Sequence, residues 1–540
     1  MSKICQHCNQ SFTIYPEDQA FYTKMQVPEP KLCPDCRQQR RLIWRNERTL
    51  YTSSCARCRQ PIISMYVPTG SPYGRVFTVY CQTCWWDDKL WSPLDFGIEV
   101  DLTKPFFEQF KQLQQQVPRV AITNTNSENS AYTNYTANNK NCYMVFSNSY
   151  GHNEDCYYGT MLAKNRNCID AIQIEDCELC YDCVDCKQSY RLVKCSMCDN
   201  CQESFWLEDC RGCSNCFMGK GLRNKQYYIL NQSYTKAAYF KKLAEYKLNT
   251  QTGFTRAQTE FADFALTLPA VYSYQLNTEH CSGDYIANSV NCRQCFDTAD
   301  SEQCSYLQYS VNQNKEVYDC SYSGGCELGI ENLSYVGGYN CLGCHIVWWN
   351  VANLAYCELC FNNTSDCFGC IGLRGKKYCI FNKQYTKIEY ERLVKQLKAS
   401  MTQEQTWSQF FPANLSPFGY NETVAQEYFP LTKVQAQKAG YLWKDESAAD
   451  LSNTAGFNQC QQCCKNFKLI KQEINFYKQL NLPVPALCFN CRHKARLFRR
   501  RPRQLWPRQC AKCHESIQTT FTPTRPELVY CAECYCKILR

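Results

Sequence analysis

The chain has little histidine and no long apolar run. Only six of its 540 residues are histidine, and no stretch of 18 or more residues is uniformly apolar. Since a membrane-spanning helix needs about 20 apolar residues, we expect no membrane association. Met1 leads directly into Ser-Lys-Ile-Cys, without the apolar stretch of a signal peptide. These absences predict a cytoplasmic protein in a reducing environment.

Motifs that carry catalysis are also missing. No histidine stands in a recognisable nucleophile, general-base or metal-catalysis motif. The chain has neither a GxxxxGK(S/T) phosphate loop nor a GxGxxG turn. We therefore expect a protein that is not an enzyme and identify no small-molecule substrate. The histidines are His7, His152, His280, His345, His493 and His514.

Cysteine, in contrast, is abundant, with 44 residues. This density is close to that of disulfide scaffolds, but those are short secreted chains. In a reducing compartment, cysteines more often bind metal or lie buried as free thiols. The spacing of the cysteines separates these two roles.

The two ends of the chain repeat each other. Six cysteines between Cys5 and Cys58 recur at a constant offset of 455 residues, and Phe21-Tyr22 recurs as Phe476-Tyr477. A fourth CxxC pair follows in each copy, preceded both times by Val-Tyr. The repeat predicts two pairs of related modules, one pair at each end.

Each module has the ligand set of a structural zinc site. Two CxxC pairs place four thiolates where they can surround one Zn²⁺ tetrahedrally, which leaves no open position for catalysis. A hairpin between the pairs and a helix after the second pair would form a treble-clef-like module. Cys464 and Cys536 stand beside ligand pairs and could replace a neighbour. We expect four zinc ions, held by Cys5, Cys8, Cys33, Cys36, Cys55, Cys58, Cys81, Cys84, Cys460, Cys463, Cys488, Cys491, Cys510, Cys513, Cys531 and Cys534.

Arginines follow the second cysteine pair at helical spacing in the first and third modules. Residues 460–540 carry a net charge of +12, whereas residues 142–216 carry −6. One reading is a nucleic-acid surface, RNA or a ribonucleoprotein, with the arginines on phosphates. The other readings are a solvated helix, or a helix docked on the acidic middle of the same chain or on a protein partner. The predicted phosphate contacts are Arg37, Arg41, Arg45, Arg492, Arg496 and Arg499.

The middle of the chain is a tandem duplication. GLRNKQYYILNQSYTKAAY at 221–239 matches GLRGKKYCIFNKQYTKIEY at 372–390, an offset of 151 residues. Between residues 177 and 216, three columns of cysteine recur every 15 residues. We interpret this as a mainly β protein with a short-turn β-solenoid of about 15 residues per turn and three strands per turn.

The cysteines of the solenoid allow three interpretations. They can fill a narrow core as free thiols, bind zinc or copper(I) as a thiolate metal store, or pair as disulfides in an oxidising compartment. The second repeat is less regular than the first, and a core tolerates such changes better than a set of metal ligands does.

The predicted organisation has seven segments. Helices of the second and third YTK-containing stretches would cap the solenoids, and an aromatic connector would join them to the last modules. The segments are zinc module 1 (1–50), zinc module 2 (51–100), solenoid repeat A (118–250), solenoid repeat B (269–400), the connector (401–459), zinc module 3 (460–505) and zinc module 4 (506–540).

The layout resembles an uncharacterised group of bacterial proteins of the candidate phyla, in which cysteine-rich repeats lie between zinc-ribbon or treble-clef modules. The residues that carry the resemblance are the CxxC pairs, the knuckle from Leu32 to Arg37, and the GLRxKxYxIxNxxYTK segments. The resemblance implies zinc binding and no particular activity.

Overall fold

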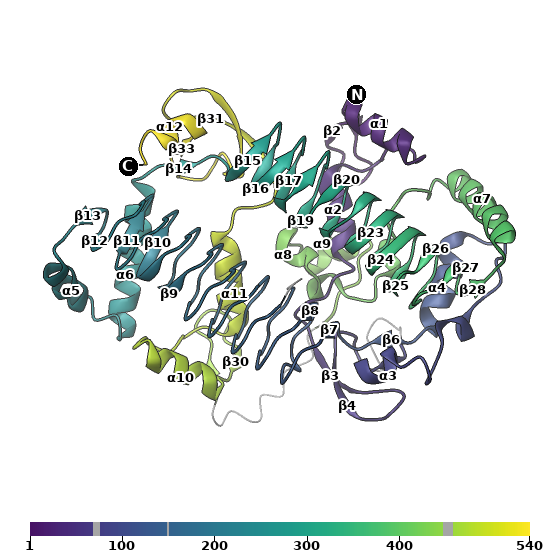
Figure 1. Ribbon diagram of the computed structural model, residues 1–540, viewed down its shortest axis with the longest axis horizontal. Coiled ribbons are helices and arrows are strands. Elements are labelled where there is room, and N and C mark those ends of the chain that lie inside the picture. The colour runs from purple at the N-terminus through teal and green to yellow at the C-terminus, as the bar shows by residue number, and fades with distance from the viewer. Residues whose placement is uncertain (69–75, 148–150, 446–456, 540) are drawn as a thin grey trace. The chain divides into compact units, whose positions relative to one another are not determined.

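A computed structural model describes residues 1–68, 76–147, 151–445 and 457–539 (Figure 1). Residues 446–456 of the predicted connector lie outside these ranges. The chain forms two compact units: residues 1–121, 273–445 and 503–505, and residues 122–272, 446–502 and 506–540. Each unit therefore combines the modules of one end with the more distant of the two repeats. The seven predicted segments are a finer division and stay a prediction.

In the second unit the chain winds through stacked coils of 12 residues. Parallel bridges step by this interval, as in Glu154 to Arg166, Glu178 and Tyr190. The backbone is left-handed at every third residue, for example at Asp176, Leu179 and Asp182. Each coil thus has four three-residue sides joined by four corners. The strands are β7 (Asn124–Thr125), β8 (Thr136–Ala137), β9 (Tyr190–Val193), β10 (Gln202–Glu208), β11 (Phe217–Lys220), β12 (Tyr228–Ile229) and β13 (Gln232–Ser233).

The predicted 15-residue, three-sided turn is therefore wrong. Inward positions recur every third residue, so any multiple of three aligns cysteine with cysteine. The observed coil is four triplets long, whereas the sequence columns reflected five. In the coil that begins at Cys177, all four inward residues are cysteine, namely Cys177, Cys180, Cys183 and Cys186, and each is at most 1% exposed.

The first unit contains the second stack, whose strands form one large sheet. Its 14 strands pair in parallel, except for the closing hairpin β27–β28. The strands are β15 (Gln275–Glu279), β16 (Gly283–Val290), β17 (Cys295–Ala299), β18 (Ser301–Glu302), β19 (Gln308–Ser310), β20 (Asn314–Tyr318), β21 (Ser321–Gly324), β22 (Glu327–Ile330), β23 (Leu333–Leu342), β24 (His345–Ala355), β25 (Glu358–Phe361), β26 (Ser365–Phe368), β27 (Lys377–Ile380) and β28 (Lys383–Gln384).

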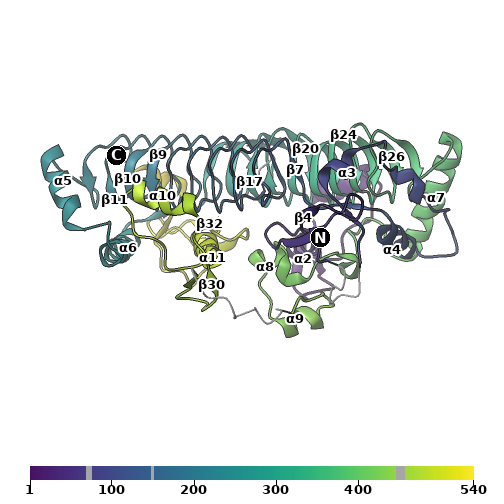
Figure 2. The same ribbon diagram turned by 90° about the horizontal axis from the view of Figure 1, so that it is seen from below.

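Helices follow each stack where the sequence predicts them (Figure 2). Thr235 and Thr386 cap their N-termini, because each side chain accepts a hydrogen bond from the backbone N–H three residues later. Within its unit, α6 covers the last coils, and Phe254 packs on Trp206. The helices are α5 (Lys236–Glu245) and α6 (Gln251–Leu266) in the second unit and α7 (Lys387–Gln403) in the first.

The N-terminal modules and the connector complete the first unit. Two hairpins precede short helices, as expected for the modules. The elements are β1 (Ser2–Ile4), β2 (Ser11–Thr13), α1 (Pro16–Lys24), α2 (Pro34–Leu42), β3 (Tyr51–Ser54), β4 (Pro61–Ser64), β5 (Val79–Tyr80), α3 (Gln82–Trp86), η1 (Pro93–Phe96), α4 (Phe106–Gln116), β6 (Arg119–Val120), η2 (Ala413–Leu415), η3 (Tyr420–Glu422), α8 (Ala425–Tyr428) and α9 (Lys433–Lys438).

The C-terminal modules repeat this arrangement in the second unit. The elements are β14 (Ala270–Val271), β29 (Asn458–Gln459), β30 (Asn466–Phe467), α10 (Lys471–Gln479), α11 (Phe489–Arg499), β31 (Trp506–Gln509), β32 (Ser516–Thr519), β33 (Val529–Tyr530) and α12 (Ala532–Cys536). The chain is mostly β, with several four-cysteine modules and a few helices. Across the described ranges, none of the helices combines the length and apolar character that crossing a membrane requires.

Candidate metal centres

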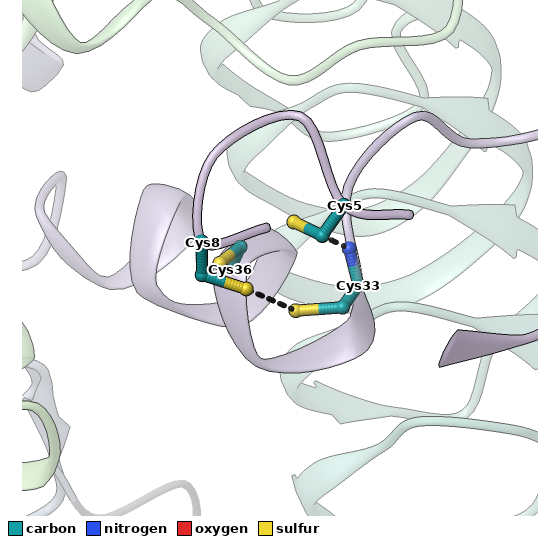
Figure 3. A group of neighbouring side chains, drawn as sticks. All are labelled: Cys5, Cys8, Cys33 and Cys36. Carbon is teal, nitrogen blue, oxygen red and sulfur yellow. Dashed lines mark hydrogen bonds between the residues drawn. The ribbon is translucent and has the colours of Figure 1, made fainter. Parts of the chain in front are cut away.

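Four groups of four cysteines come together, one in each module. They are the predicted ones: Cys5, Cys8, Cys33, Cys36; Cys55, Cys58, Cys81, Cys84; Cys460, Cys463, Cys488, Cys491; and Cys510, Cys513, Cys531, Cys534. In each group the four sulfurs lie within 4.8 Å of one another. Figure 3 shows the first group, in which the loop before α2 and the start of α2 face each other.

The first cysteine pair of each module sits in a tight knuckle. The residue four places after the first cysteine is left-handed in every module: Asn9, Arg59, Cys464 and His514 have φ between 58° and 64°. Its N–H returns to the carbonyl of the first cysteine at 2.9–3.0 Å. Cys464 therefore occupies the turn position, which explains why it is not among the four clustered thiols; Cys536 is likewise exposed and outside the cluster.

The second pair opens a helix. Cys33, Cys81, Cys488 and Cys531 are the N-cap residues of α2, α3, α11 and α12. Each donates its backbone N–H to the sulfur of the module's first cysteine, at 3.2–3.3 Å. A helix N-terminus favours negative charge, so this position stabilises a thiolate.

The sulfur spacing fits zinc. Tetrahedral Zn²⁺ with Zn–S bonds of about 2.3 Å places its sulfurs about 3.8 Å apart. The Cys8–Cys33 and Cys58–Cys81 sulfur pairs measure 3.7 and 3.8 Å, and the Cys463–Cys488 and Cys513–Cys531 pairs both measure 3.7 Å. The donor set is closed and all-sulfur, as in structural sites.

Backbone donors make several of these thiols acidic. A hydrogen bond with Cys36 is the main cause that lowers the pKa of Cys33 to about 5. Burial raises the pKa of Cys55, Cys460 and Cys510, but backbone N–H groups of their own modules outweigh it and lower each pKa to about 6. Since zinc binds the thiolate form, the knuckles are prepared for metal near neutral pH.

In the first unit, the predicted phosphate-contacting arginines are buried against carboxylates. Arg37 pairs with Asp319 at 2.8 Å, and Arg41 pairs with Glu331 at 2.9 Å. Arg45 lies beyond the end of α2, bonds Glu47 and stacks on Tyr322 at 3.8 Å. These three arginines are at most 3% exposed.

The second unit repeats the same contacts. Arg492 pairs with Asp170 at 3.1 Å, and Arg496 pairs with Asp170 at 2.9 Å and approaches Asp182 at 3.9 Å. Arg499 bonds the Asp182 carboxylate and keeps 31% of its side chain exposed. As in the first unit, the acids are one coil apart, since Asp170 and Asp182 are separated by 12 residues, as are Asp319 and Glu331.

The geometry of helix and stack explains this match. Arginines four residues apart lie about 6 Å apart along a helix, and neighbouring coils are about 4.8 Å apart. All four acids occupy left-handed corners, so their side chains form a row along the stack. The sequence analysis missed these acids, although their 12-residue spacing was a signal for them.

This placement corrects the expected surroundings of the arginines. Arg37, Arg41, Arg45, Arg492 and Arg496 are buried rather than lying on an open surface. Contact with phosphate would require them to leave their carboxylate partners. Nucleic-acid binding itself is not tested by these contacts and stays a prediction.

The central cysteines form the cores of the two stacks. All 44 cysteines are free. Among the described residues, the groups of three or more metal-ligating side chains are the four module sites. The arrangement thus agrees with thiols as core residues and shows no further cluster of ligands within the described ranges.

A second buried ion pair was not anticipated. Arg119 of β6 bonds both carboxylate oxygens of Glu358 at 2.8 and 2.9 Å, and His345 lies 3.2 Å from the same carboxylate. Arg119 and Glu358 are fully buried. This pair fastens the end of the second module to the stack of its own unit.

Comparison with known proteins identifies the first module. Residues 1–46 match the family described as "Probable treble clef domain". No protein with a curated description matches the chain. Among solved structures, one named as a candidate acetyltransferase from Desulfovibrio desulfuricans G20 shares 8% identity with a TM-score of 0.11. That match covers 46% of this chain and 63% of the other, less than two thirds of its length.

The class of protein defined by fold and site is therefore a mostly β, cysteine-rich protein with treble-clef zinc-binding modules.

Proposed function

We propose that the protein is a non-catalytic, zinc-stabilised interaction scaffold. In this proposal the stacks of coils are short-turn β-solenoids, and the zinc modules fasten onto one side of them. The observation that carries it is the duplicated arginine–acid contact, Arg37 and Arg41 on Asp319 and Glu331, and Arg492 and Arg496 on Asp170 and Asp182. The basic modules thus serve to hold the protein together.

The side of the stack with outward polar residues supports a binding role. In the second unit, one column of outward residues alternates in charge as Lys140, Glu154, Arg166 and Glu178. Lys140 and Arg166 both pair with Glu154, at 3.5 and 3.9 Å, and these side chains are 40–61% exposed. A regular, exposed, charge-balanced surface suits a protein partner, as in other repeat proteins, better than a polyanion.

Two predicted alternatives remain proposals of lower rank. Nucleic-acid binding through the module arginines needs them released from buried ion pairs. A thiolate metal store needs the core thiols to bind metal, and it predicts well over four metal ions per chain.

The scaffold is tested by purification from the source cells after nuclease digestion. We expect a complex with a protein partner in fixed stoichiometry, which the double variant Arg166→Glu, Lys187→Glu loses. The matched control is Lys241→Glu, Lys395→Glu, which changes charge equally on capping helices and should keep the complex. A monomer without a protein partner, or equal loss in both variants, would contradict the proposal.

A further inference from the structure

The first and third modules are duplicates, which makes each an internal control for the other. Residues that serve metal binding and docking are shared, since Arg37 and Arg41 correspond to Arg492 and Arg496 at the offset of 455. Four lysines of the third module have no counterpart of the same charge. Lys468, Lys471, Lys478 and Lys494 correspond to Thr13, Pro16, Thr23 and Gln39. Neither zinc binding nor docking requires these lysines.

These four lysines are exposed and unpaired. Within the described part of the chain, none of them makes an ion pair or a side-chain hydrogen bond. Residues 457–502 contain ten lysines and arginines and a single acid, Glu473. Glu473 is fully buried and paired with Arg492 at 2.6 Å. The exposed charge of this segment is therefore positive only.

The same helix face is covered in the first module and open in the third. Gln39 of α2 donates to the hydroxyl of Tyr420 at 2.8 Å, and Ile43 just beyond α2 is 2% exposed beneath the connector, whose Ser416 donates to its carbonyl at 2.7 Å. The equivalent residues of α11 are Lys494, which is exposed, and Phe498, which is 82% exposed. They are one turn apart on α11 and therefore share a face.

We propose that this surface of the third module, Lys468, Lys471, Lys478, Lys494 and Phe498, binds single-stranded nucleic acid. The ammonium groups contact backbone phosphates, and the Phe498 ring stacks on a base. An open row of cations beside an exposed aromatic ring is the combination that single-strand binding uses, since phosphates give affinity and stacking tolerates any sequence. The site differs from the predicted one because it uses lysines rather than the docked arginines.

The proposal goes beyond the scaffold and can fail independently of it. The test uses the zinc-loaded full chain and the fluorescence anisotropy of a labelled 20-nucleotide single strand of mixed sequence, as RNA and as DNA. The binding variant is K468Q/K471Q/K478Q/K494Q, and the stacking variant is Phe498→Ala. The control K111Q/K241Q/K395Q/K438Q removes the same charge from exposed lysines elsewhere.

We expect the binding variant to lose affinity at least about tenfold and the slope of log affinity against log salt to fall by roughly 3, since each phosphate contact contributes about 0.7 for single strands. The stacking variant should weaken binding on the order of tenfold or more, because base stacking contributes 1–3 kcal/mol, and the control should bind like the unchanged chain. Zinc content and thermal midpoint should be equal in all chains. RNA and DNA bound alike would assign the site to the phosphate chain, and preference for one would assign it to that sugar.

Three results would overturn the inference. These are no binding to either strand, an equal loss in the binding variant and the control, or full retention of binding by Phe498→Ala together with equal affinity for heparin. The last would show a general polyanion surface in place of a nucleic-acid site.

Discussion

At the scale of single residues, the protein is held by charges that its fold buries. Arg41 and Glu331 are at most 4% exposed and 2.9 Å apart, and Arg40 bonds the other oxygen of the same carboxylate at 2.8 Å. Removing one partner of such a pair leaves an uncompensated charge, whereas the intact pair contributes little net stability. The pairs therefore select where each module docks.

Glu331→Gln should lower the free energy of unfolding by about 3–5 kcal/mol, because Arg41 stays buried without its carboxylate. Chemical denaturation of the zinc-loaded chain measures this loss. Glu327→Gln is the matched control, since Glu327 lies on the same coil, is exposed and should change stability by less than about 0.5 kcal/mol. Similar losses in both variants would refute the role of the pair.

His345 and Glu358 should make stability depend on pH. Burial raises the pKa of Glu358, but Arg119 and His345 outweigh it and lower this pKa to about 2, so its contribution is complete above about 4.5 and lost as pH falls toward 2. Burial lowers the pKa of His345 below its ordinary 6.5, so the unfolded chain takes up the proton first. Stability should fall as pH drops below about 6.5.

The His345 effect is measured as a difference between chains. Between pH 7.5 and 5.5 the unchanged protein should lose more unfolding free energy than His345→Gln, which has no proton to gain. Zinc thiolates titrate equally in both chains and cancel in this comparison. Identical pH slopes would mean that His345 does not contribute.

At the scale of elements, the corner of the coil is the unit of construction. Asn, Asp and Gln recur there because a left-handed backbone costs an ordinary residue about 1–2 kcal/mol and these residues less. Inward positions accept small thiols and hydroxyls, and outward positions decide whether a side is covered or exposed. A triplet thus encodes corner, interior and surface in turn.

Gln188 tests this reading, since it is an exposed corner with φ of 46°. Gln188→Ile should destabilise the second unit by about 1–2 kcal/mol, because a β-branched side chain clashes in this region. Gln188→Asn should be neutral or slightly stabilising. Thermal unfolding of the three chains distinguishes the outcomes, and equal midpoints for Ile and Asn would contradict the account.

At the scale of the whole molecule, the cysteines divide into two populations. Sixteen are brought together in fours, and most of the others line the stacks as buried thiols. The first population determines how many metal ions the chain should hold. The second determines whether the cores stay dry.

Elemental analysis of protein purified under reducing conditions should therefore find about four zinc ions per chain. Chelation should remove them and melt the modules, because structural zinc supplies about 10–16 kcal/mol to such small folds. The stacks, whose cores need no metal, should keep their β signal in circular dichroism. Eight or more zinc or copper ions would instead show that the core thiols bind metal.

The sequence by itself determined the zinc ligands, the duplication of the ends and of the middle, and the helices that follow each second knuckle and each repeat. These features are local: CxxC spacing, a constant offset and a capping threonine are all legible within a few residues. The sequence also showed that inward cysteines were periodic, but any multiple of three fitted, and 15 was chosen where the coil has 12.

Only the tertiary structure decided the coil length and the partners of the arginines. Backbone pairing selects one multiple of the triplet because neighbouring coils must exchange hydrogen bonds in register. Asp170 and Arg496 are 326 residues apart, and their charges are compatible with solvent, phosphate or carboxylate until the chain is folded. The partner is fixed by which surfaces meet, because burial in the same unit makes an unpaired charge too costly to keep.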